Sequence, residues 1–228
     1  MSALSPAAHR VSPALARIAP FAIFIALLAI EPLAASQWGD PRWFTVLRPL
    51  LVACVLAVFW RHYEELHRLR MAPRHLVLAI GLGIAVFAAW IVFDRGWAVT
   101  RELKDGFNPV DDEGRIDIVL VSLRLVGFSL VVPIMEELFW RSFLLRWIEG
   151  PRNFLAVDPR KAGFAAFAMT SALFASEHSL WFAGLIAGIS YNLCFMRSRN
   201  LSAAVLSHAV TNTTLGVWIL ANHNWLLW

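Results

Sequence analysis

Seven long runs of apolar residues fill most of this chain and leave only short polar connections between them. Each run approaches the length of about 20 apolar residues that a helix needs to cross a bilayer. In hydrocarbon the backbone must satisfy its own hydrogen bonds, so such runs are expected to be helices. We therefore predict an all-α, polytopic membrane protein with about seven or eight transmembrane helices, the fourth bent at Pro133. The runs cover residues 18–36, 43–60, 76–93, 116–147, 162–176, 180–196 and 201–221.

The composition supports this class and excludes others. Of 228 residues, 59% are hydrophobic and 16% are charged, whereas soluble domains average about 45–50% and about 25%. The formal net charge of +4 provides no strongly basic surface for a nucleic acid. Cys54 and Cys194 lie in apolar runs without metal-ligand spacing, so neither a disulfide framework nor a zinc finger is expected. We predict one integral membrane domain over 1–228 that contacts the lipid bilayer and no nucleic acid.

The short polar loops carry arginine unevenly, and this asymmetry predicts the orientation. Arginines gather in the N-terminal segment, in the loops 61–75 and 148–161, and in the turn 197–200. With seven spans, these four segments lie on the same side of the membrane. Short loops rich in Lys and Arg stay in the cytoplasm, so we expect the N-terminus to be cytoplasmic.

Ionisable side chains inside the apolar runs are costly in hydrocarbon and therefore mark candidate functional sites. Three of them are isolated in the sequence. Arg48 is expected to extend to an interface, and Glu31 is a candidate ion-pair partner for Arg124. The remaining ones form three clusters in the second half of the chain: Glu136-Glu137 with Arg141, Glu177-His178, and His208 with Asn212.

The first cluster separates into a structural pair and a free carboxylate. Glu137 and Arg141 are four residues apart, so they share a helical face and are expected to form an internal ion pair. Neighbouring helical residues point about 100° apart, so Glu136 faces elsewhere and stays free for chemistry. Pro133 removes a backbone hydrogen bond just before Glu136, which opens room for water.

The other two clusters complete a hydrolytic set. Phe174 and His178 are four residues apart, as are His208 and Asn212. A carboxylate and an imidazole that share a water can deprotonate it for attack on a carbonyl, and a second imidazole with an amide can stabilise the oxyanion. The set fits peptide hydrolysis by activated water, because no serine lies in a G-x-S-x-G context. An alternative stays open in which Glu136, His178 and His208 hold a catalytic zinc, without an H-E-x-x-H motif.

Seven spans set a condition on depth. In a simple arrangement Glu136 lies toward the cytoplasmic side of the membrane, and His178 lies toward the opposite side. They can meet only if the fourth helix is long, which puts Glu136 near mid-depth, and if the fifth helix ends inside a cavity. Irregular backbone is tolerated at that depth where it lines a water-filled cavity.

The three clusters, in this order, resemble the motifs of the CAAX-protease and bacteriocin-processing (CPBP) family of intramembrane proteases. The resemblance covers about 115–222, the expected catalytic core, and implies helices arranged around a conical catalytic cavity. It implies Glu136 as the base, His178 as a residue that helps to hold the water, and His208 and Asn212 as the oxyanion hole. Eukaryotic and archaeal members cleave prenylated CAAX proteins, so the implied substrate is a membrane-associated or lipidated protein. Glu137, Arg141 and Phe174 are expected to support these residues.

A closer resemblance concerns the runs 136–143 and 177–181. They are similar to a bacterial CAAX-protease-related subgroup associated with exosortase systems, which implies the bacterial cytoplasmic (inner) membrane and exosortase-system proteins as partners. No cofactor is assigned, and a divalent metal such as zinc stays an alternative because the metal requirement of the family is disputed. Two other functions stay open: a catalytically silent scaffold for immunity or sorting, and a proton-coupled transporter, although no internal repeat is seen.

Overall fold

The computed structural model describes residues 11–37, 40, 42–100, 106–111 and 113–228. Within these ranges the chain is helical and contains no β-strand; an isolated bridge joins Val110 and Ile116. The α-helices are α1 (Pro13–Gln37), α2 (Arg42–Val58), α3 (Pro73–Val92), α4 (Ile118–Val126), α5 (Val132–Glu137), α6 (Leu145–Glu149), α7 (Phe164–Ser176), α8 (Trp181–Ser198) and α9 (Leu201–Asn222).

Helices α4, α5 and α6 are parts of one long helix, Ile118–Glu149, of 32 residues. Two π-helical segments, η4 (Gly127–Val131) and η5 (Leu138–Leu144), join them without a break. Counted this way, the described residues form 7 helices, as the apolar runs predict. Where the sequence predicts a bend at Pro133, the helix widens into the π turn η4, because proline cannot donate the hydrogen bond of a regular α turn.

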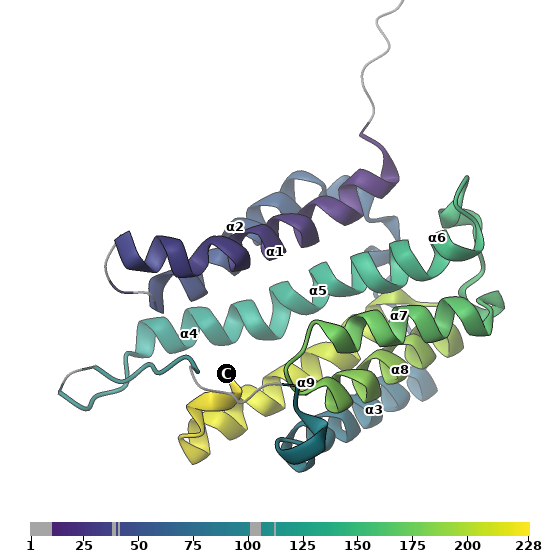
Figure 1. Cartoon of the computed structure of the whole chain (residues 1–228). Helices are drawn as coiled ribbons and strands as arrows, with labels where there is room; N and C mark the ends of the chain where they lie inside the picture. Colours follow the sequence, from purple (N-terminus) through teal and green to yellow (C-terminus); the bar gives the residue numbers. More distant parts are fainter. Residues whose placement is uncertain (1–10, 38–39, 41, 101–105, 112) are drawn as a thin grey trace, which may run out of the picture.

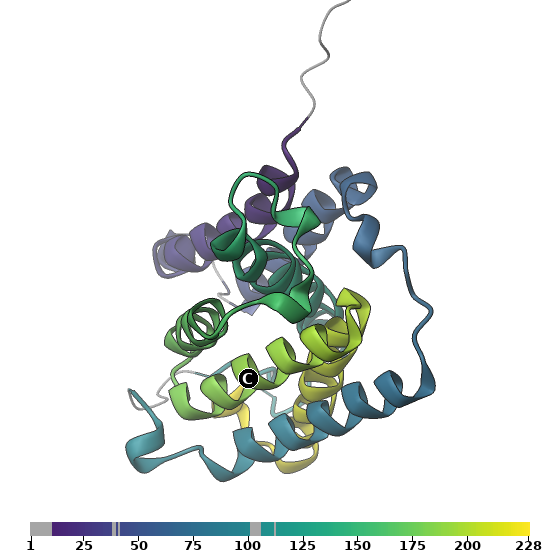
Figure 2. The same cartoon turned by 90° about the vertical axis from the view of Figure 1, so that its right-hand side faces the viewer.

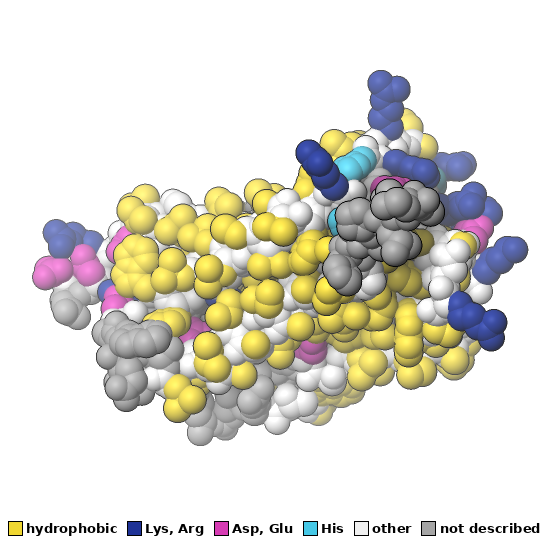
Figure 3. All heavy atoms as spheres, turned by 90° about the horizontal axis from the view of Figure 1, so that it is seen from above, with side chains coloured by type: hydrophobic (Ala, Val, Ile, Leu, Met, Phe, Trp, Pro, Cys, Tyr) yellow, Lys and Arg dark blue, Asp and Glu magenta, His cyan; other side chains and the backbone are white. Residues whose placement is uncertain are grey.

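Four helices are long and apolar enough to cross a membrane: Pro13–Leu33, Pro73–Val92, Ile118–Glu149 and Leu201–Asn222. They indicate an integral membrane protein. Large apolar side chains face outward along the helices, with charged groups gathered toward the ends (Figure 3). Val77, for example, is 71% exposed, which suits contact with lipid. Spans by the shorter helices, and the full count of about seven or eight, stay predictions.

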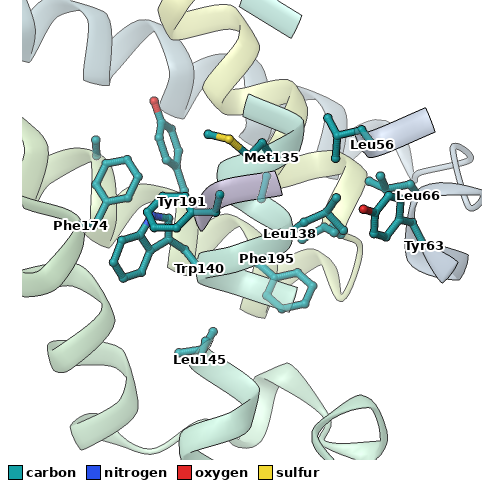
Figure 4. Packing of buried hydrophobic residues seen from close by; sticks show 14 of the residues in the cluster. Leu56, Tyr63, Leu66, Met135, Leu138, Trp140, Leu145, Phe174, Tyr191 and Phe195 are labelled. Carbon is teal, nitrogen blue, oxygen red and sulfur yellow. The ribbon is translucent and has the colours of Figure 1, made fainter. Parts of the chain in front are cut away.

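The long helix runs through the middle of the molecule (Figure 1). Helices α1 and α2 pack on one side of it, and α3, α7, α8 and α9 lie on the other (Figures 1 and 2). Buried apolar side chains from the long helix, α7, α8, the end of α2 and the segment after it meet around the second half of the long helix (Figure 4). The labelled members of this core are Leu56, Tyr63, Leu66, Met135, Leu138, Trp140, Leu145, Phe174, Tyr191 and Phe195.

The arginine-bearing segments meet at one end of the molecule. They surround a depression of about 1170 Å³ whose wall includes Arg17, Arg61, Arg146 and Arg199. Arg17 is buried and donates to both carboxylate oxygens of Glu65, at 2.9 and 2.6 Å. This clustering fits the predicted orientation, whose assignment to the cytoplasm stays a prediction.

Glu65 joins the loop after α2 to α1 and to the long helix. It accepts hydrogen bonds from Arg17 and from Ser142, and it forms an ion pair with Arg146 at 3.3 Å. Burial alone would raise the pKa of Glu65, but the hydrogen bonds and charge of Arg17 and the Ser142 hydroxyl hold it below its ordinary value of 4.5. The stabilisation that Glu65 provides is therefore present above pH 4.5 and is lost as the pH falls through the lowered pKa of the folded state.

We expect Glu65→Gln to lower the free energy of unfolding at neutral pH by about 3 kcal/mol, because it leaves the buried Arg17 guanidinium without its counter-charge. The variant should also lose less stability than the native chain when the pH is lowered below 4.5. Thermal unfolding in detergent at neutral and acidic pH measures both effects. Glu64→Gln is the control, because Glu64 is exposed; equal stability of native and Glu65→Gln proteins at every pH would contradict the prediction.

Helices α3 and α9 approach closely at Gly83. A Cβ at this position would lie 2.5 Å from the Ser207 carbonyl oxygen and 2.8 Å from the Val210 Cβ, whereas nothing lies within 4 Å of a Cβ at Gly81. We expect Gly83→Ala to cost about 1–3 kcal/mol through overpacking, and Gly81→Ala to be neutral or stabilising by about 0.5–1 kcal/mol. The unfolding midpoints of the Gly83→Ala and Gly81→Ala variants, each compared with that of the native protein, test this. Equal changes in the two midpoints would show that α3 and α9 do not pack tightly at Gly83.

Candidate active site

A cavity of about 290 Å³ lies beside the middle of the long helix. Its wall includes residues of α1 and α2 on one side of that helix and of α3, α7, α8 and α9 on the other. Glu136, His178, His208 and Asn212 all lie on its wall. The structure thus brings together the four residues that the sequence predicts to carry the chemistry, although they come from three different parts of the chain.

Glu136 and His178 can reach the same cavity because the helix that carries Glu136 is long and the helix before His178 is short. Glu136 lies near the middle of the 32-residue helix rather than at its end. Helix α7 has only 13 residues and ends at Ser176, so the backbone leaves the helix just before His178. Both side chains then face the same cavity.

The Glu137 side chain is fully buried, and one of its carboxylate oxygens contacts both Arg141 and His208. Its Oε1 lies 3.1 Å from Arg141 Nη1 and 2.9 Å from His208 Nδ1. The contact with Arg141 is the ion pair that the four-residue spacing predicts. The contact with His208 is not predictable from spacing, because 71 residues separate the two positions. It fixes the imidazole by its Nδ1 and leaves Nε2 uncommitted.

Arg141 extends this network to α8. Its guanidinium donates to Asn192 Oδ1 and to the Gly188 carbonyl, both at 3.2 Å, and lies over the Phe174 ring at 4.6 Å. The Asn192 amide in turn donates to hydroxyls of α7, at 2.9 Å to Thr170 and 3.0 Å to Ser171. The role of Asn192 does not follow from residue spacing; its one signal in the sequence is a polar side chain inside the apolar run 180–196.

His178 is held by the residue four positions earlier. Its Nδ1 lies 2.8 Å from the Phe174 carbonyl oxygen. Because a carbonyl oxygen can only accept, Nδ1 carries the proton and Nε2 of the neutral ring is an acceptor. The rings of Phe174 and Trp90 lie 4.9 and 5.3 Å from the imidazole, so aromatic contacts fix its plane.

Glu136 keeps a free oxygen. Its side chain is buried, and Oε2 has no hydrogen-bond partner among the described residues. Glu177 also lies on the cavity wall and is close enough for its charge to act on Glu136. The sequence indicates Glu177 only as the neighbour of His178 in the second cluster and predicts no role for it. The cavity wall therefore holds two carboxylates, Glu136 and Glu177, together with both histidines.

Asn212 and His208 are oriented by contacts on either side of α9. Asn212 Nδ2 donates to the Phe128 carbonyl oxygen in η4 at 2.8 Å. In the π register the N–H of Val132 bonds to the carbonyl oxygen of Gly127. The next carbonyl, that of Phe128, would accept from the N–H of residue 133, but this residue is proline and has no backbone N–H. Asn212 thus satisfies the carbonyl that Pro133 leaves free. His208 stacks on the Tyr191 ring at 4.6 Å.

The zinc alternative lacks a gathered ligand set. In the ranges that the structure describes, no three His, Cys, Asp or Glu side chains come together as metal ligands. Both histidines are held through Nδ1, by Phe174 O and Glu137 Oε1, which leaves Nε2 as the ring nitrogen that a metal could bind. Glu136, His178 and His208 share the cavity but, within the described ranges, are not gathered as a set of metal ligands.

The isolated charges pair differently from the prediction. Glu31 forms an ion pair with Arg48 and accepts a hydrogen bond from Thr45 at 2.7 Å. The predicted ion pair of Glu31 with Arg124 is not formed, although the two charges act on each other. Arg48 is only 12% exposed, so the prediction that it extends to an interface is also wrong. The cause is the packing of α1 directly on α2, which places the single acid beside the nearer arginine.

Comparison with known protein families supports this picture. Residues 118–214 match the family model described as Type II CAAX prenyl endopeptidase Rce1-like. The matched segment contains the long helix, α7, α8 and most of α9, and with them all three clusters. Over these residues the chain is similar to an Rce1-like domain of the type II CAAX prenyl endopeptidase (CPBP) family. Neither the curated proteins nor the solved structures gave a match.

We expect Arg141→Met to lower the free energy of unfolding by about 3–5 kcal/mol, because it leaves the Glu137 carboxylate buried without its cation. The double variant Glu137→Gln/Arg141→Met should recover part of this loss, since the two side chains interact directly. Unfolding of the two single variants and the double variant in detergent measures the coupling. Arg95→Met, at an 87% exposed side chain, is the control, and strictly additive losses would contradict the buried pair.

Proposed function

We propose that this protein is an intramembrane protease that hydrolyses a peptide bond of a membrane-associated or lipidated protein. The observation that carries the proposal is the convergence of Glu136, His178, His208 and Asn212 on one cavity between apolar helices. The match to an Rce1-like family model over the same helices supports it. Several large apolar side chains of α1, among them Phe21, Phe24 and Leu28, line the cavity and suit a hydrophobic substrate.

Glu136 and His178 prepare the attacking water. The free Oε2 of Glu136 accepts a proton from the water, and Nε2 of His178 accepts its second hydrogen and thereby orients it. The water oxygen bonds to the substrate carbonyl carbon, whose oxygen takes the negative charge. Glu136 then passes its proton to the departing nitrogen as the C–N bond breaks.

His208 and Asn212 stabilise the oxyanion. His208 donates from Nε2 when the ring carries both protons, and the Glu137 carboxylate at Nδ1 offsets the charge of that form. Asn212 uses one amide hydrogen on Phe128 O and keeps the other for the oxyanion. In known proteases one such donor contributes about 2.7–4 kcal/mol to the transition state.

The cellular setting belongs to the same proposal. The resemblance of runs 136–143 and 177–181 supports a location in a bacterial cytoplasmic (inner) membrane, with exosortase-system proteins as partners. The gathering of arginines at one end supports a cytoplasmic N-terminus.

We expect Glu136→Gln to lower turnover by about 10²–10⁴-fold, the usual contribution of a positioned general base, without unfolding the protein. Mass spectrometry of membrane-protein termini and released peptides, in cells with native or variant protein at equal abundance, provides the measurement. Glu64→Gln makes the same chemical change at an exposed position outside the cavity and should retain activity. Identical termini with native and Glu136→Gln proteins would refute the proposal.

A further inference from the structure

The arginine-rich depression at one end of the molecule takes no part in the proposed reaction. Among the described residues, it shares no wall residue with the cavity that holds Glu136. Its volume of about 1170 Å³ exceeds the ~300–1,000 Å³ of most small-molecule sites. Six arginines and three acids line it, so its wall carries an excess of three positive charges. They are Arg17, Arg61, Arg68, Arg70, Arg146 and Arg199, with Glu64, Glu65 and Asp158.

Two of the three acids are already engaged by arginines. Glu65 forms ion pairs with Arg17 and with Arg146, at 2.6 and 3.3 Å. Asp158 forms an ion pair with Arg199 at 3.2 Å. These contacts build the deeper part of the depression, where Arg17 and Arg146 are buried. The acids therefore leave the remaining arginines of the wall largely uncompensated.

Three arginines of the wall are exposed and unpaired. Arg61, Arg68 and Arg70 lie in the segment after α2, and their side chains form no hydrogen bond or ion pair with any residue that the structure describes. The backbone that carries them is nevertheless held in place. Asn200, in the turn between α8 and α9, donates from Nδ2 to the carbonyl oxygens of Arg68 and Arg70, at 3.1 and 3.3 Å. The free guanidinium groups are thus kept beside the depression by a distant part of the chain.

The surroundings of the depression are those of a membrane–water interface. Arginine side chains gather at this end of the molecule, where the apolar outer surface ends (Figure 3). Trp60 and Trp147 are exposed, and each adjoins an arginine of the wall in the sequence. Tryptophan is enriched at the level of the lipid headgroups. Leu155 and Phe195 add apolar side chains to the wall itself, so the depression combines cations with apolar surface.

We propose that this depression binds the headgroup of an anionic phospholipid, with Arg61, Arg68 and Arg70 as the groups that contact its phosphate. A guanidinium fork matches phosphate oxygens with two parallel hydrogen bonds, and basic pockets between membrane helices are suited to anionic headgroups. Leu155 and Phe195 then contact the glycerol and the first acyl carbons. This apolar part of the wall favours a lipid over an acidic protein segment. The inference does not rest on the proposed function.

The test measures lipid binding to the purified full chain in detergent by native mass spectrometry, with phosphatidylglycerol and phosphatidylcholine as probes. The native protein should bind phosphatidylglycerol at least about tenfold more tightly than phosphatidylcholine. An arginine near anionic lipid contributes about a fivefold factor in affinity. The variant Arg61→Gln/Arg68→Gln/Arg70→Gln should therefore bind phosphatidylglycerol about 100-fold more weakly, with its binding of phosphatidylcholine unchanged.

A matched control removes the same charge from the same end of the molecule. Arg74, Arg152 and Arg197 are exposed, and none of them lines the depression. The variant Arg74→Gln/Arg152→Gln/Arg197→Gln should keep its affinity for phosphatidylglycerol within about fivefold of the native value. Equal losses in the two triple variants would show a diffuse attraction to negative charge and would overturn the site.

Three further outcomes would overturn the inference. The first is equal affinity of the native protein for phosphatidylglycerol and phosphatidylcholine, a result that needs no variant to fold. The second is displacement of phosphatidylglycerol by an equal concentration of glycerol 3-phosphate, which would identify a site for a soluble phosphate. The third is binding of a synthetic polyglutamate peptide, but not of phosphatidylglycerol, that depends on Arg61, Arg68 and Arg70; the occupant would then be an acidic protein segment.

Discussion

The buried carboxylate of Glu137 holds the active-site region together. It binds Arg141 on its own helix and His208 on α9, and Arg141 continues to Gly188 and Asn192 on α8. Three helices are thereby joined through one carboxylate that is fully buried. Because breaking a buried pair leaves an uncompensated charge, these helices cannot slide past one another without losing the whole network. Of the reactive groups, His208 belongs to this frame through its Nδ1, whereas Glu136 keeps a carboxylate oxygen without a partner among the described residues.

Buried polar atoms without partners are rare in proteins and usually have a reason. Among the described residues, several of those found here belong to the long helix: Arg124 Nε, Ser129 Oγ, Glu136 Oε2, Glu137 Oε2 and Trp140 Nε1. The supporting residues around them, such as Asn192 and Thr211, have their hydrogen bonds satisfied. The long helix thus carries buried polar atoms without partners at Arg124 and Glu136, and both of these residues line the cavity.

The sequence predicts the helices and the local pairs well, because both depend on periodicity. The apolar runs locate the seven helices, and the spacing of four gives the Glu137–Arg141 pair. Contacts between helices are different, because they depend on the rotation and depth of each helix. The bond from His208 to Glu137 was missed for this reason, and Glu31 was assigned to Arg124 although it binds Arg48. A lone charge in an apolar run indicates that a partner or a function exists, but not which one.

The π turn η4 determines the angle about the helix axis between the directions of Arg124 and Glu136. In a regular α-helix each residue turns by about 100°, so twelve residues would leave Arg124 about 120° away from the direction of Glu136. The wider turn at Gly127–Val131 accommodates about one more residue per turn, which removes most of that difference. The π turn before Pro133 therefore rotates the first part of the long helix relative to the second. As a result, Arg124 and Glu136 on one helix both line the same cavity.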